Sequence, residues 1–223
     1  MAPSRQLLPL LSSLGSFRWT LIRTLRSDNP LDLNGELRGT ATFTLLPATT
    51  ERDWLYSEEG EIPSAVTGGA ALPGLRWTKK YIWRESVDAG RISVWFVKVT
   101  PGPEEADYLF HNFDFPNDIR QGNNSNQPDG PLAEDLGQST LDEGNKDDEE
   151  LVTPPTPPNS ALDDTETTVL TAQGNHLCIN DMYRTAYAFR ILSKTGEVVS
   201  WASRHVVKGP KKNQDIVNRY ERA

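Results

Sequence analysis

His176 and Cys178 are the two residues whose types and spacing point most directly to chemistry. Two positions apart on an extended strand, they share one face. Such a pair could be a thiolate–imidazole couple for nucleophilic catalysis, or part of a metal site completed by His111 or Asp181. The chain has no second cysteine and no His-Glu-x-x-His motif. We therefore favour a buried cysteine beside a structural histidine, and we expect no metal and no cofactor.

Glu58 is the second candidate for chemistry. If its side chain faces the interior it needs a cationic partner such as Arg23, because an unpaired buried carboxylate becomes neutral. A buried Arg23–Glu58 pair can serve to specify the fold. A perturbed Glu58 can also act as a general acid or base. The enzyme hypothesis is therefore an isomerase, cyclase or hydrolase that uses Glu58, Tyr81 or His176.

In two segments, 77–83 and 183–191, most residues at alternate positions are aromatic. They line one face of a strand, either as a filled core or as the wall of a mostly apolar cavity with a few polar groups. Both interpretations stay open at this point. The predicted ligand-binding residues are Arg23, Tyr56, Glu58, Tyr81, Trp83, His111, His176, Tyr187 and Trp201.

The elements that position these residues are predicted to be short strands, because apolar and polar residues alternate with a period of two. Ten such segments occur, at 17–25, 37–45, 54–61, 77–86, 91–99, 107–115, 169–178, 183–192, 197–207 and 215–222. Gly/Pro-rich turns separate them, and Gly196 is expected to adopt a positive φ. The fold class is all-β, a closed antiparallel up-and-down barrel, because closure removes exposed edges. A flat sandwich is the main competitor.

The N-terminal residues 2–14 are predicted to form a short helix that plugs one end of the barrel. A mitochondrial transit peptide is the alternative, because Arg5 is basic and no acidic residue precedes Asp28. The single cysteine suits a reducing compartment, and we expect a cytoplasmic protein. No run of 18 apolar residues is present, so no membrane association is expected.

Residues 116–168 differ in composition from the rest of the chain. They contain no Phe, Trp or Tyr, and thirteen Asp and Glu residues oppose only Arg120 and Lys146, a net charge of −11. Subtracting −11 from the whole-chain −8 leaves +3 for the remainder. A segment so poor in apolar residues is predicted to be a disordered insertion within one domain spanning 14–222. Nucleic-acid binding is not expected, since the net charge is negative and no binding motif occurs.

The tract Thr153-Pro154-Pro155-Thr156-Pro157-Pro158 is typical of polyproline II structure. It is interpreted as a solvated loop without a partner, and alternatively as a ligand for an aromatic groove or as a proline-directed phosphorylation site at Thr153 or Thr156. The insertion 116–168 is in either case the segment through which a protein partner would bind.

The C-terminal half carries a resemblance to a known family. The residues that carry it are His176-Leu177-Cys178, Asp181, Tyr183, Tyr187, Phe189, Trp201, Val206, Gly209, Pro210, Lys212, Tyr220 and Arg222. Upstream matches are Arg23, Tyr56-x-Glu58-x-Gly60, Tyr81-x-Trp83, Phe96, Phe110-His111 and Phe113-Asp114. Together, over 14–115 and 168–222, they resemble the domain-of-unknown-function family numbered 6314, found in bacteria and fungi. The long insertion resembles fungal members. The resemblance implies a lipocalin-like (calycin) barrel and no established activity.

The start of the first strand, residues 15–19, also resembles that of lipocalins, in which an aromatic residue closes the barrel floor. In that comparison Arg204 or Arg219 would cover the aromatic ring. The sequence thus predicts a barrel that binds a small hydrophobic or amphipathic ligand. The enzyme hypothesis and an interaction module acting through 116–168 are the alternatives. A ligand-binding barrel should contain a cavity of more than roughly 100 Å³.

Overall fold

The computed structural model describes residues 4–47, 52–62, 75–86, 90–115, 151–159, 166–178, 180–210 and 212–223. The elements are α1 (Ser4–Gly15), β1 (Trp19–Ser27), β2 (Gly35–Leu45), β3 (Asp53–Glu61), β4 (Arg76–Ser86), β5 (Arg91–Val97), β6 (Ala106–Asp114), β7 (Thr167–Cys178), β8 (Asp181–Leu192), β9 (Val198–Lys208) and β10 (Asn213–Arg222). Residues 1–116 and 151–223 make up one compact unit.

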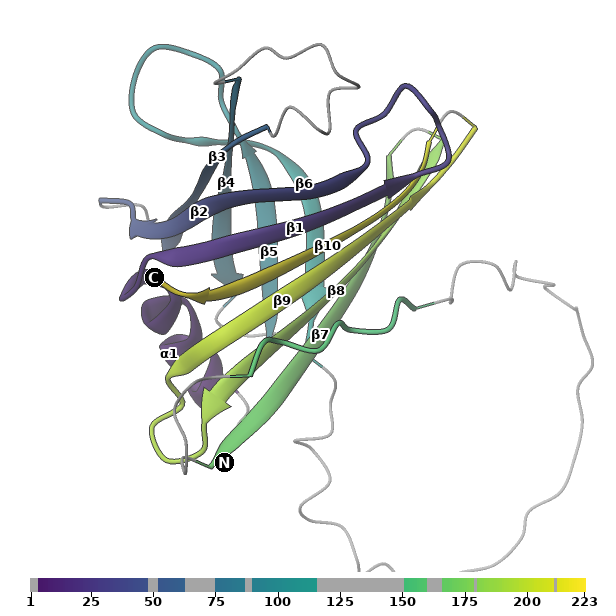
Figure 1. Ribbon diagram of the computed structural model, residues 1–223. Coiled ribbons are helices and arrows are strands. Elements are labelled where there is room, and N and C mark those ends of the chain that lie inside the picture. The colour runs from purple at the N-terminus through teal and green to yellow at the C-terminus, as the bar shows by residue number, and fades with distance from the viewer. Residues whose placement is uncertain are drawn as a thin grey trace, which may run out of the picture. The chain divides into compact units, whose positions relative to one another are not determined.

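The ten strands form a closed antiparallel barrel (Figure 1). Each strand pairs with the next one in the chain, and β10 closes the circle by pairing with β1 from Trp19↔Arg222 to Ser27↔Gln214. The predicted all-β up-and-down barrel is therefore confirmed, and the flat sandwich is wrong. Closure through β1 and β10 leaves neither the first nor the last strand as an open edge, which is the physical advantage of a barrel over an open meander.

Alternation along each strand divides the side chains between inside and outside. On β1, Trp19, Leu21 and Arg23 are buried, while the residues between them are more exposed. Gly196, in the β8–β9 hairpin, has a φ of 72°, as the turn chemistry predicted. The inward positions near the start of β1 and the end of β10 form an apolar core, and those toward the opposite end are more polar.

Helix α1 closes one end of the barrel, as predicted. Leu10, Leu11 and Leu14 are at most 2% exposed and belong to the barrel core. Two hydrogen bonds fix the helix: Trp19 Nε1 donates to the Leu14 carbonyl at 2.9 Å, and the Val198 amide donates to Ser13 Oγ at 2.7 Å. We call this closed end the floor. The burial of the leucine side chains, not helix propensity alone, stabilises such a short helix.

The prediction that Arg204 or Arg219 covers the aromatic ring at the floor is wrong. Arg204 pairs with Asp215, and Arg219 is exposed, because both side chains point outward between inward-facing neighbours. Trp19 is instead covered by α1. The stacked arginine is Arg222, whose guanidinium carbon lies 3.9 Å from the ring centroid of Phe17.

The C-terminal limit of the predicted insertion also needs correction. Strand β7 begins at Thr167, and residues 151–159 lie against the outer face of the barrel. Val152 is only 9% exposed, so this segment is not a solvated loop. The remainder of the predicted insertion, 116–150 and 160–165, lies outside the described residues. Composition missed the contact because a proline-rich segment buries its area against a surface that only the folded barrel provides.

Candidate functional site

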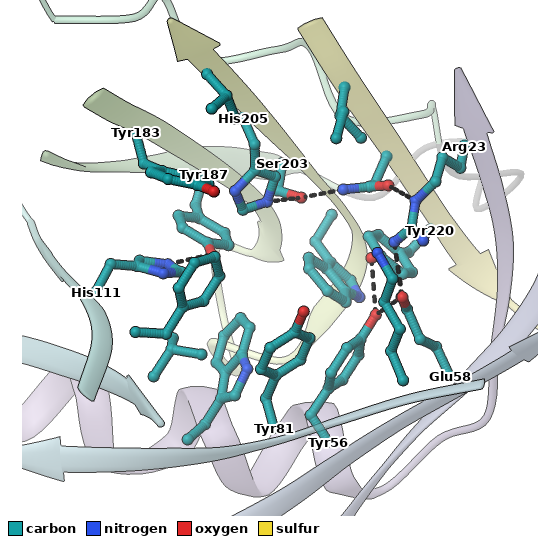
Figure 2. A pocket seen from close by; sticks show the side chains of 18 of the residues that line it. Arg23, Tyr56, Glu58, Tyr81, His111, Tyr183, Tyr187, Ser203, His205 and Tyr220 are labelled. Atoms are coloured by element: carbon teal, nitrogen blue, oxygen red, sulfur yellow. Dashed lines mark hydrogen bonds and ion pairs between the residues drawn. The ribbon is translucent and has the colours of Figure 1, made fainter. Parts of the chain in front are cut away.

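A cavity of about 300 Å³ occupies the barrel between its apolar floor and the opposite end, which we call the mouth. Its size lies at the low end of the range for small-ligand sites and exceeds the lower limit set from the sequence. The lining side chains belong to Arg23, Tyr56, Glu58, Lys79, Tyr81, Trp83, Val94, Phe96, Phe110, His111, Tyr183, Tyr187, Trp201, Ser203, His205, Val207, Gln214, Ile216, Asn218 and Tyr220. Figure 2 shows most of them pointing toward a common centre.

An ion pair between β1 and β3 forms the polar side of the cavity. Arg23 Nη2 donates to both oxygens of Glu58, at 2.8 and 2.9 Å, so the partner predicted for Glu58 is confirmed. The Tyr56 hydroxyl donates to Glu58 Oε2 at 2.6 Å and lies 2.9 Å from the Tyr220 hydroxyl. Arg23 and Glu58 are 6% and 2% exposed, so the pair is held by mutual attraction and hydrogen bonds that offset its desolvation.

The network continues across β10 and β9 (Figure 2). Arg23 Nε donates to Asn218 Oδ1 at 2.6 Å, and Asn218 Nδ2 donates to Ser203 Oγ at 2.9 Å. His205 Nε2 lies 3.2 Å from the same Ser203 hydroxyl. One chain of contacts therefore joins four strands around the mouth. Each group limits the rotamers of the next, which gives a preformed polar surface rather than a set of independent side chains.

Burial in this network changes the acid–base properties of its members. Burial disfavours the charged form of Arg23, but Glu58, Tyr220 and Tyr56 together outweigh this effect and raise the pKa of the guanidinium. Burial raises the pKa of the Tyr56 and Tyr220 hydroxyls, and the negative charge of Glu58 adds to both shifts. At neutral pH the arginine is therefore charged and the two tyrosines are neutral donors.

His111 and Tyr187 form a second polar contact on the opposite wall. His111 Nε2 lies 2.8 Å from the Tyr187 hydroxyl, and both side chains are at most 2% exposed. Burial, reinforced by His205 and His176, lowers the pKa of His111 well below its usual value. Burial also lowers the pKa of His205 to about 3, and the charges of Arg23 and Lys79 add to that shift. Both imidazoles are thus neutral at pH 7.

Lys79 and Tyr81 are the polar groups that the cavity leaves without partners. Neither makes a hydrogen bond or an ion pair with any of the described residues. Lys79 is reached by water at the mouth, yet the surrounding wall still desolvates it and lowers the pKa of its ammonium group. Burial raises the pKa of Tyr81 to about 12, so its hydroxyl, which points toward the centre of the cavity in Figure 2, remains a donor.

The charges of the described lining residues do not balance. Arg23 and Lys79 carry two positive charges and Glu58 one negative charge, which leaves one net positive charge while the histidines are neutral. Two buried nitrogen atoms of lining rings, His111 Nδ1 and Trp201 Nε1, also lack a hydrogen-bond partner among the described residues. An unpaired buried polar atom costs about 1–3 kcal/mol and is unusual outside functional sites.

Comparison with known proteins identifies the family. The model of a family of unknown function, DUF6314, matches residues 16–129 and 158–222. The chain belongs to the DUF6314 family. No curated protein and no solved structure matches it.

The residues predicted for the ligand site are largely brought together in this DUF6314 chain. Arg23, Tyr56, Glu58, Tyr81, Trp83, His111, Tyr187 and Trp201 all line the cavity. His176 does not. It is half-buried, with its ring centroid 6.5 Å from that of Phe110 and 6.4 Å from that of Tyr183, behind the residues that line the mouth.

The chemistry considered for His176 and Cys178 is not supported by their positions. The Cys178 thiol is exposed and not buried, contrary to the expectation from sequence. Within the described part of this DUF6314 chain, no three His, Cys, Asp or Glu side chains are placed to hold a metal ion. The enzyme hypothesis needed hydrogen-bonding contact between its acid–base residues. Among the described contacts none links Glu58, Tyr81 and His176 to one another.

Sequence reasoning missed several lining residues on β9 and β10, chiefly Ser203, His205, Asn218 and Tyr220. Alternation within β9 places Trp201, Ser203 and His205 on one face, so this signal was present in the sequence. No described helix of this DUF6314 chain is long and apolar enough to cross a membrane.

Proposed function

We propose that the barrel binds a small amphipathic molecule with an apolar body and one acidic group. The observation that supports this most strongly is a cavity of about 300 Å³ with an ammonium group at its mouth, that of Lys79, which has no partner among the described residues. The cavity holds the volume of roughly ten water molecules at about 30 Å³ each, which suits a compact ligand of one or two rings.

The orientation of the ligand follows from the distribution of the lining groups. Its apolar body would lie against aromatic rings near Tyr81, where Phe96 and Phe110 are 4.8 Å apart between centroids. Its acidic group would lie near Lys79 and take a hydrogen bond from the Tyr81 hydroxyl. The Arg23–Glu58 pair is already saturated by its own contacts, so it would shape the polar wall and contribute little binding energy.

In this proposal the barrel works as calycin barrels do, as a carrier or sensor in a reducing compartment. The up-and-down barrel with its helical floor supports the likeness, and the exposed Cys178 thiol supports the compartment. Partner binding through 116–168 stays a prediction, since most of that segment lies outside the described residues.

The test compares an acidic probe with its neutral analogue. We expect naphthoate to bind the purified protein in isothermal titration calorimetry more tightly than naphthalenemethanol. Lys79→Met should weaken naphthoate binding by about tenfold, the effect of losing about 1.4 kcal/mol of charge attraction, and should leave the alcohol unaffected. Lys80→Met is the matched control, because Lys80 lies on the outer face of β4, paired with Glu104 at 2.6 Å.

A second variant tests the location of the site. Ile216→Trp places a large ring at a lining position and should abolish binding of both probes while the barrel stays folded by circular dichroism. Equal losses in Lys79→Met and Lys80→Met, or full binding to Ile216→Trp, would show that the probes bind elsewhere and would overturn the proposal. Native mass spectrometry of the freshly purified chain then identifies any ligand that co-purifies.

A further inference from the structure

Residues 151–159, which we call the strap, are fastened to the outer face of the barrel. Gln173 Nε2 on β7 donates to the Val152 carbonyl at 2.7 Å, and Ser200 Oγ on β9 donates to the Pro158 carbonyl at 2.6 Å. Arg190 on β8 donates from Nε to the Pro158 carbonyl at 3.1 Å. The strap thus crosses three strands, as Figure 1 shows.

The strands beneath the strap carry small, outward-facing side chains. Ala186, Ala188 and Ala202 point outward, because their neighbours Tyr187 and Trp201 line the cavity. All three alanines are nevertheless at most 1% exposed. Small side chains leave room for proline rings, and Pro157 is buried in this region. The small residues of β8 and β9 therefore suit the strands to the packing of the strap against them.

Two threonines of the strap face away from this contact. Thr153 and Thr156 are both exposed, whereas Val152 and Pro157 are buried. The polyproline II conformation has three residues per turn, so residues three apart project from the same side. Each threonine is followed directly by proline, at Pro154 and Pro157. The strap thus presents two Thr-Pro motifs side by side on a fixed backbone.

These threonines border a groove of about 430 Å³ lined by three arginines, Arg26, Arg204 and Arg219. Arg204 is paired with Asp215, which also lines the groove, at 2.8 Å. Arg26 and Arg219 are exposed, and neither makes an ion pair with a described residue. Three positive charges and one negative charge leave two net positive charges beside the threonines. Two unpaired guanidinium groups beside a hydroxyl acceptor are suited to a phosphate group.

We propose that Thr153 and Thr156 are acceptors for a proline-directed protein kinase and that the resulting phosphate binds Arg26 and Arg219. In the reaction the threonine Oγ1 attacks the γ-phosphorus of ATP, the bond from that phosphorus to the bridging oxygen breaks, ADP leaves, and the hydroxyl proton passes to the kinase. The dianionic phosphothreonine then neutralises the two unpaired arginines and clamps the strap on β1 and β10.

The two halves of this site differ in how the family model covers them. The DUF6314 model match ends at residue 129 and resumes at 158, so both threonines lie outside it, while the three arginines lie inside it. The barrel therefore supplies the basic groove, and the inserted segment supplies the acceptors. The proposal does not depend on what the cavity binds.

The acceptor half of the proposal is tested with a purified proline-directed kinase, ATP and the full-length protein. The chain contains a third Thr-Pro motif, Thr100-Pro101, in the exposed β5–β6 loop, which serves as an internal control. Mass spectrometry should find phosphate at Thr153 or Thr156, and Thr153→Val/Thr156→Val should remove it while leaving any label at Thr100. A folded chain that stays unlabelled at both strap threonines, while the urea-denatured chain is labelled there, would overturn this half.

The groove half is tested with phosphothreonine incorporated during translation at position 153 or 156. Such protein should melt about 2–4 °C higher than the unmodified chain, the shift expected for a contact worth about 1 kcal/mol. Its ³¹P resonance should titrate with a pKa below the usual value of about 6, because the guanidinium groups favour the dianion. Phosphothreonine at position 100 is the control and should show neither effect.

Arginine variants decide where the phosphate binds. Arg26→Gln/Arg219→Gln should abolish the rise in melting temperature and restore the ordinary phosphate titration. Arg38→Gln/Arg76→Gln removes the same charge from exposed positions on β2 and β4 and should change neither result. If the first pair of substitutions has no more effect than the second, the phosphate does not bind the groove, and the proposal is wrong.

Discussion

The floor and the mouth of this barrel are built from the same ten strands but use opposite chemistry. At the floor, Trp19, Leu14 and Phe189 are fully buried, and two hydrogen bonds hold the helix, one from the Trp19 indole to the Leu14 carbonyl and one from the Val198 amide to Ser13 Oγ. At the mouth, an ion pair, six hydroxyls and two neutral histidines surround open space. The floor therefore supplies stability, whereas the mouth holds groups whose contacts with one another offset the cost of burying them.

The largest effect is expected at the floor. Trp19→Ala removes a fully buried ring and the hydrogen bond to Leu14, and should lower the free energy of unfolding by about 4 kcal/mol. Urea denaturation followed by circular dichroism measures this change. A loss below about 1 kcal/mol would mean that α1 does not form the floor in solution.

Breaking the ion pair at the mouth should lower the free energy of unfolding by nearly as much, and a second substitution should restore most of it. Glu58→Leu leaves Arg23 buried without its carboxylate and should cost about 3 kcal/mol, whereas Arg23→Met/Glu58→Leu should recover most of it. The same denaturation series measures both variants. If the double variant is no more stable than Glu58→Leu alone, the ion pair contributes more to the free energy of unfolding than the mutual cancellation of two buried charges. The proposed contrast between the mouth and the floor would then be wrong.

The mouth should also make stability depend on pH. The pKa of His205 is lowered in the folded state to about 3, so its contribution is fully present above pH 6.5 and is lost as pH falls toward 3. Between pH 7 and 5 the wild type should lose up to about 2 kcal/mol from this group, and His205→Gln should lose correspondingly less. The control is Thr78→Val, at an exposed position of β4 without a titrating side chain, which should follow the wild-type pH profile.

The smallest predicted effect is a difference in stability between variants of two tyrosines that face each other across β3 and β4. Tyr56 and Tyr81 stack with ring centroids 6.3 Å apart, but only Tyr56 donates to Glu58. Tyr56→Phe should cost about 1.5 kcal/mol, because the carboxylate loses a buried donor, and Tyr81→Phe should change stability by less than about 0.5 kcal/mol. Thermal unfolding of both variants compares them directly. A larger cost for Tyr81 would show that its hydroxyl has a structural role and is not free for a ligand.

Much of the candidate site could be predicted because alternation assigns each strand residue to a face. Arg23, Glu58, Tyr81 and Tyr187 were placed inside on this basis, and they line the cavity. His176 obeyed the same rule but does not line the cavity, because alternation gives the face and not the height along the barrel. Ser203 and Asn218 were missed because their role arises from contact between distant strands.

The sequence by itself determined the class of fold, its ten strands, the helical floor and the pairing of Glu58 with Arg23, because each follows from local periodicity or from the cost of an unpaired buried charge. Only the tertiary structure decided that a cavity remains between the aromatic rings. It also decided that the strap lies against strands with buried, outward-facing alanines and that Thr153 and Thr156 border two arginines that make no ion pair with a described residue. These features depend on the distances between side chains of strands that are far apart in the chain. A local sequence pattern does not determine such distances.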